Sequence, residues 1–211
     1  MTIPIIVFAK APRPGEVKTR LIPALGPAGA ARLHQQLVER ALATATAAAI
    51  GPVELCCAPD TSDPVLAALA RAHGAALTPQ GPGDLGDRMH AAFKCALARV
   101  PAAIVIGCDC PALRPEHLRE AGGALDAGYD AALAPAEDGG YVLIGLTRVT
   151  QRLFNGICWG ESTVMAQTRG RLAALGWRWH ELETLWDVDR PDDLARLGQS
   201  ADANRTEERR S

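Results

Sequence analysis

The sequence predicts an α/β fold of three layers, with helices on both faces of a mostly parallel central sheet and one small antiparallel element. Short apolar runs alternate with longer helical patterns, and Gly or Pro marks the breaks between them. Strands joined through helices need right-handed crossovers, which put the helices on the faces of the sheet. After Asp130, two strand-like runs stand too close together for such a crossover, so an antiparallel pair is expected there.

The elements follow in order along the chain. Apolar runs predict strands at residues 3–8, 53–58, 75–78 and 103–107. The patterns between them predict helices at 28–49, 63–73 and 87–99, and a further helix starting at Pro115, whose fixed φ suits a first helical turn. The later elements are expected as strands at 131–134 and 141–146, a helix at 162–175 capped by Ser162, and an alternating edge strand at 177–182.

Length and composition indicate one domain over residues 1–197 and a polar, disordered tail over 198–211. A net charge of -2 provides no basic field for nucleic acid, and no segment reaches the roughly 18 apolar residues of a membrane span. Lys10 ends the first apolar run too early for an export signal, so a cytoplasmic protein is expected. The cysteines lack C-x-x-C spacing and are interpreted as small buried thiols, with Cys56 and Cys57 on opposite faces of a strand.

A basic loop follows the first predicted strand, beginning at Ala9. It combines four cations with helix-breaking Pro and Gly residues directly behind a strand end, where ligands of such sheets bind. Lysine offers a point charge and arginine a fork for phosphate oxygens, although a solvated basic loop is the alternative. The expected phosphate-binding residues are Lys10, Arg13, Lys18 and Arg20.

A glycine-rich segment contains G-x-G-x-x-G at Gly81, Gly83 and Gly86, which raises the alternative of an NAD-binding oxidoreductase. The preceding strand is weak, Pro82 removes an amide donor, and Asp84 would face the pyrophosphate. We therefore interpret the segment as a close backbone approach to a nucleobase or ribose. The residues expected beside the nucleoside are Gly83, Asp84, Gly86 and Arg88.

Two acidic segments are the candidates for a metal site. Asp109 ends an apolar strand two residues before a proline, and a carboxylate on a rigid strand end can bind Mg²⁺ directly; a turn aspartate is the alternative. Asp187 and Asp189 lie on one side of an extended segment, so Asp189 is expected as the second metal carboxylate with Asp187 beside it. Asp192 and Asp193 suit the first turn of a following helix.

The acceptor site is expected around the turn that begins at Asp138, whose carboxylate can position or deprotonate an acceptor hydroxyl, with Lys18 as the second catalytic residue. An ordinary turn is equally compatible with the pattern. The other acceptor-binding candidates are Gly139, Gly140, Tyr141 and, as a stacking platform, Trp159. The five histidines show no H-x-x-x-H spacing, and G-x-S-x-G and Walker A motifs are absent.

In order, these segments resemble the DUF2064 family, also called radical-SAM/selenodomain-associated transferase 1, over about residues 3–197. The most specific pieces are P-x-P-G-x-x-K-T-R-L at 12–21, D-G-G-Y at 138–141 and D-x-D-x-P-x-D-L at 187–194; residues 83–89 and 107–113 add to them. The family is placed in the nucleotide-diphospho-sugar transferase superfamily, with a GT-A-like fold. Similar motifs occur in molybdenum-cofactor and phospholactate nucleotidyltransferases.

The resemblance implies that Lys10, Lys18 and Arg20 bind phosphates, that residues 83–88 flank the nucleoside, and that Asp109 with Asp189 holds Mg²⁺ or Mn²⁺. We expect a metal-dependent transferase that uses a nucleotide-sugar donor to modify a small-molecule acceptor, with neither nucleic acid nor membrane as partner. The alternatives are a nucleotidyltransferase that releases pyrophosphate from a nucleoside triphosphate, and a nucleotide-binding regulator without turnover.

Overall fold

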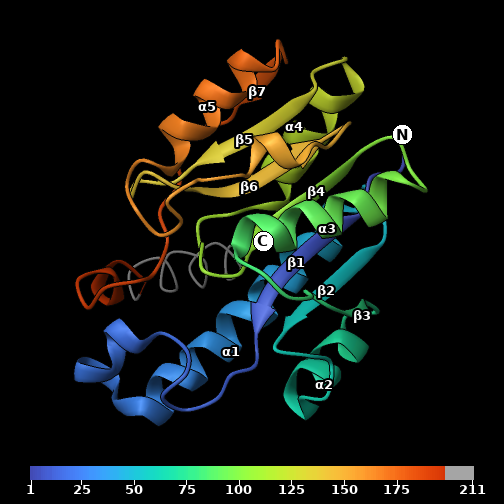
Figure 1. Cartoon of the computed structure of the whole chain (residues 1–211). Coiled ribbons are helices and arrows are strands. Elements are labelled where there is room, and N and C mark those ends of the chain that lie inside the picture. Colours follow the sequence, from blue (N-terminus) through green and yellow to red (C-terminus); the bar gives the residue numbers. More distant parts are fainter. Residues whose placement is uncertain (198–211) are drawn as a thin grey trace, which may run out of the picture.

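The structure, a computed structural model, describes residues 1–197 (Figure 1), so the expected tail at 198–211 lies outside the described residues. Seven strands form one sheet in the order β3-β2-β1-β4-β6-β5-β7. The strands are β1 (Ile5–Lys10), β2 (Val53–Ala58), β3 (Ala76–Pro79), β4 (Ala103–Gly107), β5 (Ala131–Pro135), β6 (Tyr141–Leu146) and β7 (Trp179–Glu181). The helices are α1 (Ile22–Ala48), α2 (Pro64–Ala72), α3 (Leu85–Leu97), α4 (Pro115–Asp126) and α5 (Val164–Ala174), with short 3-10 turns η1 (Thr19–Leu21) and η2 (Gln151–Leu153).

The strand pairing confirms a mostly parallel sheet with one antiparallel element. β1 pairs in parallel with both β2 and β4, β2 with β3, and β5 with β7. β6 runs antiparallel to both of its neighbours, β4 and β5, because only a short turn joins it to β5. The chain leaves β1 toward β2 on one side and returns through β4 on the other, so the strand order reverses between β1 and β4.

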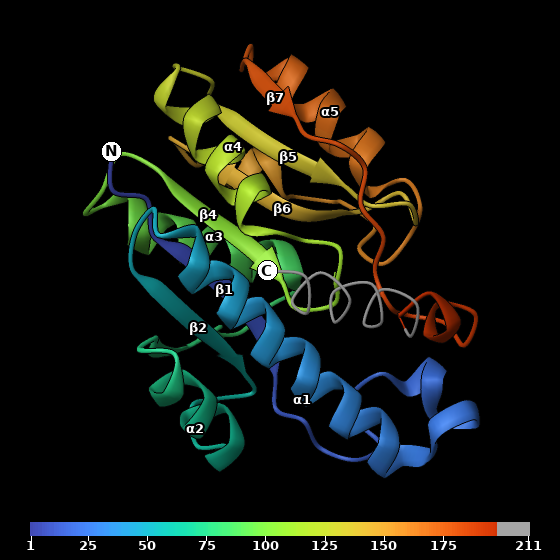
Figure 2. The same ribbon diagram turned by 180° about the vertical axis from the view of Figure 1, so that it is seen from behind.

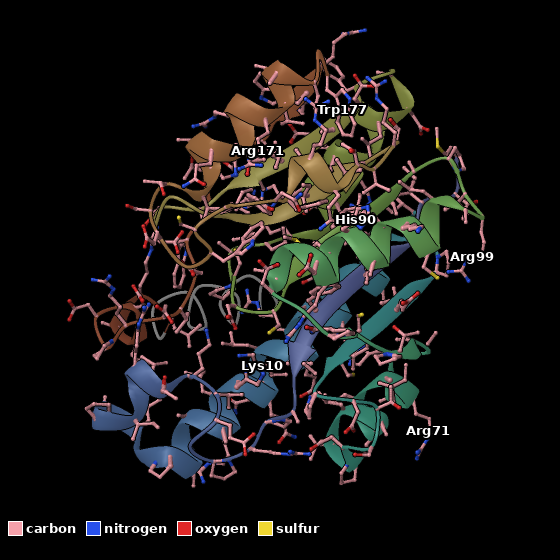
Figure 3. The ribbon with its side chains drawn as sticks, viewed as in Figure 1. Lys10, Arg71, His90, Arg99, Arg171 and Trp177 are labelled. Atoms are coloured by element: carbon pink, nitrogen blue, oxygen red, sulfur yellow. The ribbon has the colours of Figure 1, made fainter. Side chains whose placement is uncertain are left out.

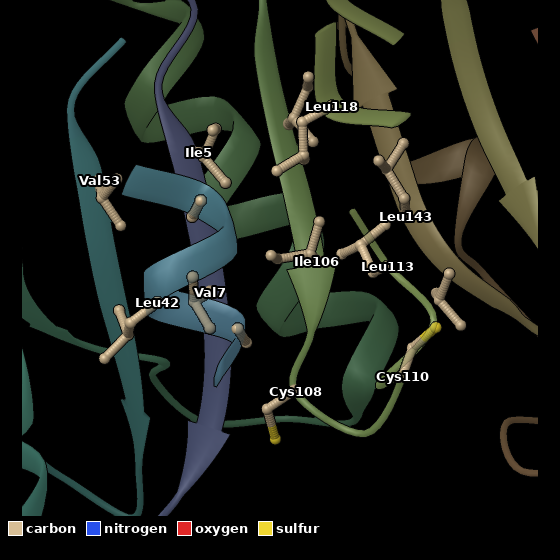
Figure 4. Close-up of a cluster of buried hydrophobic side chains, with 14 of the residues drawn as sticks. Ile5, Val7, Leu42, Val53, Ile106, Cys108, Cys110, Leu113, Leu118 and Leu143 are labelled. Carbon is tan, nitrogen blue, oxygen red and sulfur yellow. The ribbon is translucent and has the colours of Figure 1, made fainter. Parts of the chain in front are cut away.

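Two apolar clusters, one on each face of the sheet, confirm the three layers. Along β1, Ile5 and Val7 pack with the buried faces of α1, α2 and α4, whereas Ile6 and Phe8 pack with α3 and α5. Seen from behind, α1 and α4 lie in front of the sheet (Figure 2), and the apolar side chains of the first cluster meet between α1 and β1, β2 and β4 (Figure 4). The described helices therefore sandwich the sheet.

Cys56 and Cys57 were predicted to lie on opposite faces of a strand. The structure confirms this, because Cys57 lies in the first apolar cluster and Cys56 in the second. Cys108 and Cys110 are buried at the end of β4 (Figure 4), but Cys95 and Cys158 are exposed, so burial of every thiol was a wrong expectation. All described cysteines are free thiols.

Helix starts were predicted less well than strands. α1 begins six residues earlier than expected, because a kink at Gly26 (φ 68°, ψ 164°) accommodates the Gly and Pro residues that seemed to exclude a helix. α5 begins at Val164, and neither Ser162 nor the N-cap residue Thr163 makes a side-chain cap hydrogen bond. The prediction of Ser162 as a cap is therefore wrong. No helix in the described part of the chain combines the length and apolarity that a membrane span needs.

Candidate functional site

A cavity of about 650 Å³ opens at the carboxyl ends of β1 and β4. The strand order reverses between these two strands, and crevices at such reversals are where open α/β sheets bind ligands. Its walls come from β1 and residues 16–20 of the following loop, residues 107–109 after β4, the start of α3, and Asp189. Figure 3 shows Lys10 at this edge and Arg99 at the opposite edge of the sheet.

Lys18 links three distant parts of the chain in this cavity. The backbone at Lys18 takes a left-handed conformation (φ 48°), which turns the loop into η1. The ammonium Nζ lies 2.9 Å from Asp109 Oδ1 and donates to the Val188 carbonyl at 2.5 Å, and only 4% of the side chain is exposed. The buried cation thus joins the loop after β1 to the end of β4 and to the C-terminal segment.

The predicted acidic pair also meets at this edge. The Val188 backbone N–H donates to the Asp109 carbonyl (2.9 Å), which fixes the C-terminal segment alongside the end of β4. Arg20 forms an ion pair with Asp189, and Asp109 and Asp189 both line the cavity. Asp193 accepts from the backbone N–H groups of Asp189 and Arg190, which is a structural role of the kind expected for it.

Asp187 stands half-buried behind this wall and does not line the cavity. Burial and, to a smaller extent, the negative charge of Asp138 raise the pKa of its carboxyl group to about 6, against opposing effects of a backbone hydrogen bond and of Lys18. The charge of Asp109 acts in the same direction as that of Asp138. Three carboxylates therefore influence one another at this end of the sheet.

His34, on α1, is a cavity residue that sequence reasoning missed. Its Nε2 lies 3.0 Å from the Lys10 carbonyl, and its Nδ1 lies 3.9 Å from Asp109 Oδ1. Desolvation lowers the pKa of this imidazole below its usual value, with the charge of Asp109 as a smaller opposing effect. A usable signal was present, because His34 falls at helical spacing among the apolar residues of α1 that face the sheet.

The glycine-rich segment serves mainly to start α3. Asp84 accepts from the Asp87 N–H and the Asp87 carboxylate accepts from the Asp84 N–H, which forms a capping box. A Cβ on Gly83 would lie 2.6 Å from Asp87, and one on Gly86 would lie 2.9 Å from the Trp159 indole. Gly83, Asp84 and Gly86 thus make contacts within the protein and do not line the cavity, and their approach to a nucleoside stays a prediction.

Arg88 does line the cavity, and Gln80 holds it in place. Arg88 donates to the Gly83 carbonyl (3.0 Å) and to Gln80 Oε1 (3.4 Å). The buried Gln80 amide donates to the carbonyls of Ala9 (3.1 Å) and Cys56 (2.9 Å). Gln80 and the exposed Leu85 are further lining residues to which sequence reasoning gave no role.

Other predicted site residues also lie outside the cavity lining, among them Arg13, Tyr141, Trp159 and the turn residues Asp138, Gly139 and Gly140. Arg13 points toward Asp63, with 3.9 Å between Nε and Oδ2. The Tyr141 hydroxyl donates to the Met89 sulfur (3.8 Å), and burial raises its pKa. The Tyr141 ring meets Trp159 edge-on, with 6.4 Å between the ring centroids, so the two aromatic residues pack against each other, and their contact with an acceptor stays a prediction.

The turn between β5 and β6 holds Asp138 in a defined, exposed position. Its Oδ1 accepts from the Gly140 N–H at 2.8 Å. Gly139 has φ 91°, and a Cβ there would lie 2.1 Å from the Ser162 carbonyl oxygen. The Met165 N–H donates to the Gly139 carbonyl (2.8 Å), so the turn is anchored to the start of α5.

The cavity therefore has a cationic and an anionic side. Lys10, Lys18, Arg20 and Arg88 offer donors that suit phosphate oxygens. Asp109 and Asp189 offer the carboxylate oxygens that divalent cations prefer. Donor atoms of His34, Cys108 and Asp109 also lie within 4.8 Å of one another, which gives the described residues one compact group able to hold a metal ion.

Residues 41–161 match the model of a family described as "Uncharacterized protein conserved in bacteria (DUF2064)". A protein of Desulfovibrio desulfuricans G20, provisionally named a nucleotide-diphospho-sugar transferase, is 32% identical with a TM-score of 0.80 over 90% of this chain and 83% of its own. No curated protein gives a significant match.

Two more distant structures share the fold. A CMP:2-keto-3-deoxy-manno-octonic acid synthetase complexed with CTP is 14% identical (TM-score 0.59), covering 97% of this chain and 100% of its own. Glucosyl-3-phosphoglycerate synthase from Mycobacterium tuberculosis, in complex with Mn²⁺, UDP and glucosyl-3-phosphoglycerate, is 13% identical (TM-score 0.58), covering 93% of this chain and 75% of its own.

Proposed function

The chain belongs to the DUF2064 family, and from that premise we propose that it is a nucleotide-utilising transferase that works in the cavity between β1 and β4. One observation carries the proposal: buried Lys18 contacts Asp109 in a cavity that also contains Arg20, Arg88 and Asp189. Cations for phosphate oxygens thus face carboxylates for a metal ion at the point where the strand order reverses. Residues 1–197 act as one domain in this proposal.

Asp109 and Asp189 would hold a divalent cation, Mg²⁺ or Mn²⁺, with Asp187 as a further carboxylate beside them. The chain fits such an ion, because Asp109 Oδ1 lies 3.9 Å from the buried Nδ1 of His34, which has no hydrogen-bond partner among the described residues, and Asp189 lines the same cavity. When bound, the ion would neutralise charge on the nucleotide's phosphates. Support for this choice comes from the Mn²⁺ complex of the Mycobacterium tuberculosis synthase.

The finer proposal is transfer of a glycosyl group from a nucleotide sugar to a small-molecule hydroxyl. The acceptor oxygen bonds to the anomeric carbon, the bond from that carbon to the diphosphate oxygen breaks, and Asp138 takes the hydroxyl proton. Lys18 and Arg20, with Lys10 and Arg88 behind them, stabilise the negative charge on the departing nucleoside diphosphate.

Nucleotidyl transfer is the second candidate, because four cations surround the cavity and suffice for a triphosphate. The acceptor then attacks the α-phosphorus and pyrophosphate leaves. The CTP-bound synthetase is a protein of similar fold that fits this alternative. In either case we propose a cytoplasmic protein that binds neither nucleic acid nor a membrane.

The leaving group separates the candidates. The full chain is incubated with Mg²⁺ or Mn²⁺ and a panel of nucleotide sugars or nucleoside triphosphates, with small alcohols and sugars as acceptors. Nucleoside diphosphate released from a nucleotide sugar supports glycosyl transfer, and pyrophosphate released from a triphosphate supports nucleotidyl transfer. Asp109→Asn should abolish either product while the exposed Asp192→Asn retains it. Tight nucleotide binding without either product across the panel would favour a regulator.

A further inference from the structure

The imidazole of His34 is a cavity group whose buried nitrogen has no partner among residues 1–197 that accounts for it. Its side chain is 6% exposed, and Nδ1 is buried without a hydrogen-bond partner in the part of the chain that the structure describes. An unpaired buried polar atom is unfavourable and needs an explanation. His34 is one of the residues that line the cavity, so a bound ligand would explain the unpaired nitrogen.

The hydrogen bond at the other ring nitrogen decides what Nδ1 can do. Nε2 lies 3.0 Å from the Lys10 carbonyl, and a carbonyl only accepts, so the proton of the neutral ring sits on Nε2. Nδ1 then presents a lone pair. The Asp109 Oδ1 oxygen, 3.9 Å away, is an acceptor and too distant for a hydrogen bond, so it does not satisfy that lone pair. Two electron-pair donors therefore lie 3.9 Å apart, and a cation bound between them would replace the Lys18 ammonium that contacts the same Asp109 oxygen at 2.9 Å.

Their separation suits one metal ion. Two donors at about 2.1 Å from an ion stand about 3.0 Å apart when cis and about 4.2 Å apart when trans, and the 3.9 Å of this pair is close enough to these values that a small side-chain shift would let both atoms bind one ion. A carbonyl bond at the far ring nitrogen is also the usual way in which proteins orient a ligating histidine. The Cys108 thiol, whose sulfur lies 3.4 Å from Asp109 Oδ1, donates to that carboxylate.

We propose that His34 Nδ1, together with Asp109, is a direct ligand of the divalent cation, and that this nitrogen makes the site prefer Mn²⁺, Co²⁺ or Zn²⁺ over Mg²⁺. Imidazole suits the first-row transition metals and zinc, whereas an all-oxygen site suits Mg²⁺. The inference rests on the proposed function for the presence of a cation and adds the ligand that selects among cations.

The test is direct binding of Mn²⁺ alone to the full chain, with pulsed electron paramagnetic resonance to detect nitrogen coupled to the manganese. His34→Gln places an amide where Nε2 stood, which can keep the Lys10 hydrogen bond while deleting Nδ1. His34→Asn places an amide where Nδ1 stood and deletes the Nε2 atom that bonds to the Lys10 carbonyl. His90→Gln, on α3 outside the cavity, is the matched control, and thermal unfolding of each variant checks that it folds.

We expect imidazole nitrogen coupling in the wild type and in His90→Gln, and its loss in His34→Gln, with Mn²⁺ affinity at least about tenfold lower, the smaller end of what even outer-shell changes cause. Mg²⁺ affinity should change less. Bound Mn²⁺ without nitrogen coupling, or with coupling that persists in His34→Gln, overturns the inference and leaves the proposed function standing. If the wild type binds no Mn²⁺, both the inference and the metal part of the proposed function are wrong.

Discussion

At the scale of single residues, Lys18 makes the contacts on which the cavity depends. Its ammonium contacts Asp109 and the Val188 carbonyl, and a phosphate group in the cavity would exchange with these partners. We predict that Lys18→Gln lowers the kcat/KM for product release by roughly 10²–10³-fold, the usual loss when one donor to developing charge is removed. Steady-state kinetics of leaving-group release measures it.

The matched control is Lys94→Gln, which removes an exposed lysine of α3 and should leave the kinetics unchanged. Equal losses of kcat/KM in the two variants would mean that the overall charge of the protein, and not a contact of Lys18, causes the effect. An unchanged kcat/KM in Lys18→Gln would remove Lys18 from the phosphate site.

Asp187 shows an electrostatic conflict at the same site. Its folded pKa of about 6 exceeds the ordinary value of 3.8, so the folded protein holds this proton more tightly than the unfolded chain does. Stability therefore falls as pH rises between these values, and the penalty is complete above about pH 6. We predict that Asp187→Asn, in metal-free protein, raises the melting temperature near pH 8 and has little effect near pH 4.

Thermal unfolding at the two pH values measures this difference, with exposed Asp192→Asn as the comparison. A lower melting temperature for Asp187→Asn near pH 8 would mean that the ionised carboxylate has favourable partners that outweigh its burial beside Asp138.

The sequence indicates the position of some cavity residues and not of others, and the difference depends on which element carries the side chain. The carboxyl ends of parallel strands meet at one edge, so Lys18 in the loop after β1 and Asp109 after β4 were expected together at the cavity where they lie, and Asp189 was expected with them from its alternation with Asp187. His34 was not, because it sits in mid-helix and reaches the edge only through packing of α1 on the sheet. Tyr141 follows a loop, but its hydroxyl points to the Met89 sulfur, because a place beside a loop does not determine the direction in which a side chain points.

At the scale of elements, the turn between β5 and β6 depends on one glycine. Gly139 combines φ 91° with a space in which a Cβ would lie 2.1 Å from the Ser162 carbonyl oxygen. Gly160 has a similar φ of 84°, but a Cβ there would meet no atom within 4 Å, so this position isolates the backbone strain. We predict that Gly160→Ala costs about 1–2 kcal/mol of stability, and that Gly139→Ala costs a further ~1–3 kcal/mol because of the overlap.

Urea denaturation of the two variants measures the difference. Gly139→Ala should also lower kcat, because the turn that carries Asp138 must shift, while Gly160→Ala should not. Equal stabilities would show that the turn and the start of α5 are not held together as the structure describes.

The agreement between predicted and observed bounds differs from one element to another. The bounds of β2, β4 and β6 match their predicted ranges, because each is an apolar run ended by Pro, Gly, Asp or a polar turn. The start of α1 was predicted too late, because residues that break a helix in isolation are accommodated by the kink at Gly26. Tertiary packing thus decides helix starts that local propensity leaves open.

At the scale of the whole molecule, the reversal of strand order between β1 and β4 gathers segments from three parts of the chain. Residues 18–20, 107–109 and 187–189 line or flank one cavity, held by Lys18, Arg20 and the Val188–Asp109 backbone hydrogen bond. Sequence periodicity predicts the layers, but it does not give the order of strands in the sheet. The cavity's shape, and therefore its choice of base and acceptor, follows from that order.

Because the cavity joins these distant segments, a ligand bound there should stabilise the entire fold. At a concentration of about 100 times its Kd, a ligand adds about 2.7 kcal/mol to the free energy of unfolding, which for a chain of this size corresponds to roughly 5–11 °C in melting temperature. We predict this shift for nucleoside di- or triphosphates with Mn²⁺ or Mg²⁺, a smaller one without the cation, and almost none for the parent nucleosides. Arg20→Gln should reduce the nucleotide shift, because it removes a phosphate donor and the ion pair to Asp189 together. A nucleoside that stabilises as strongly as its diphosphate would contradict the assignment of the cationic wall to phosphates, since recognition would then rest on the base and ribose.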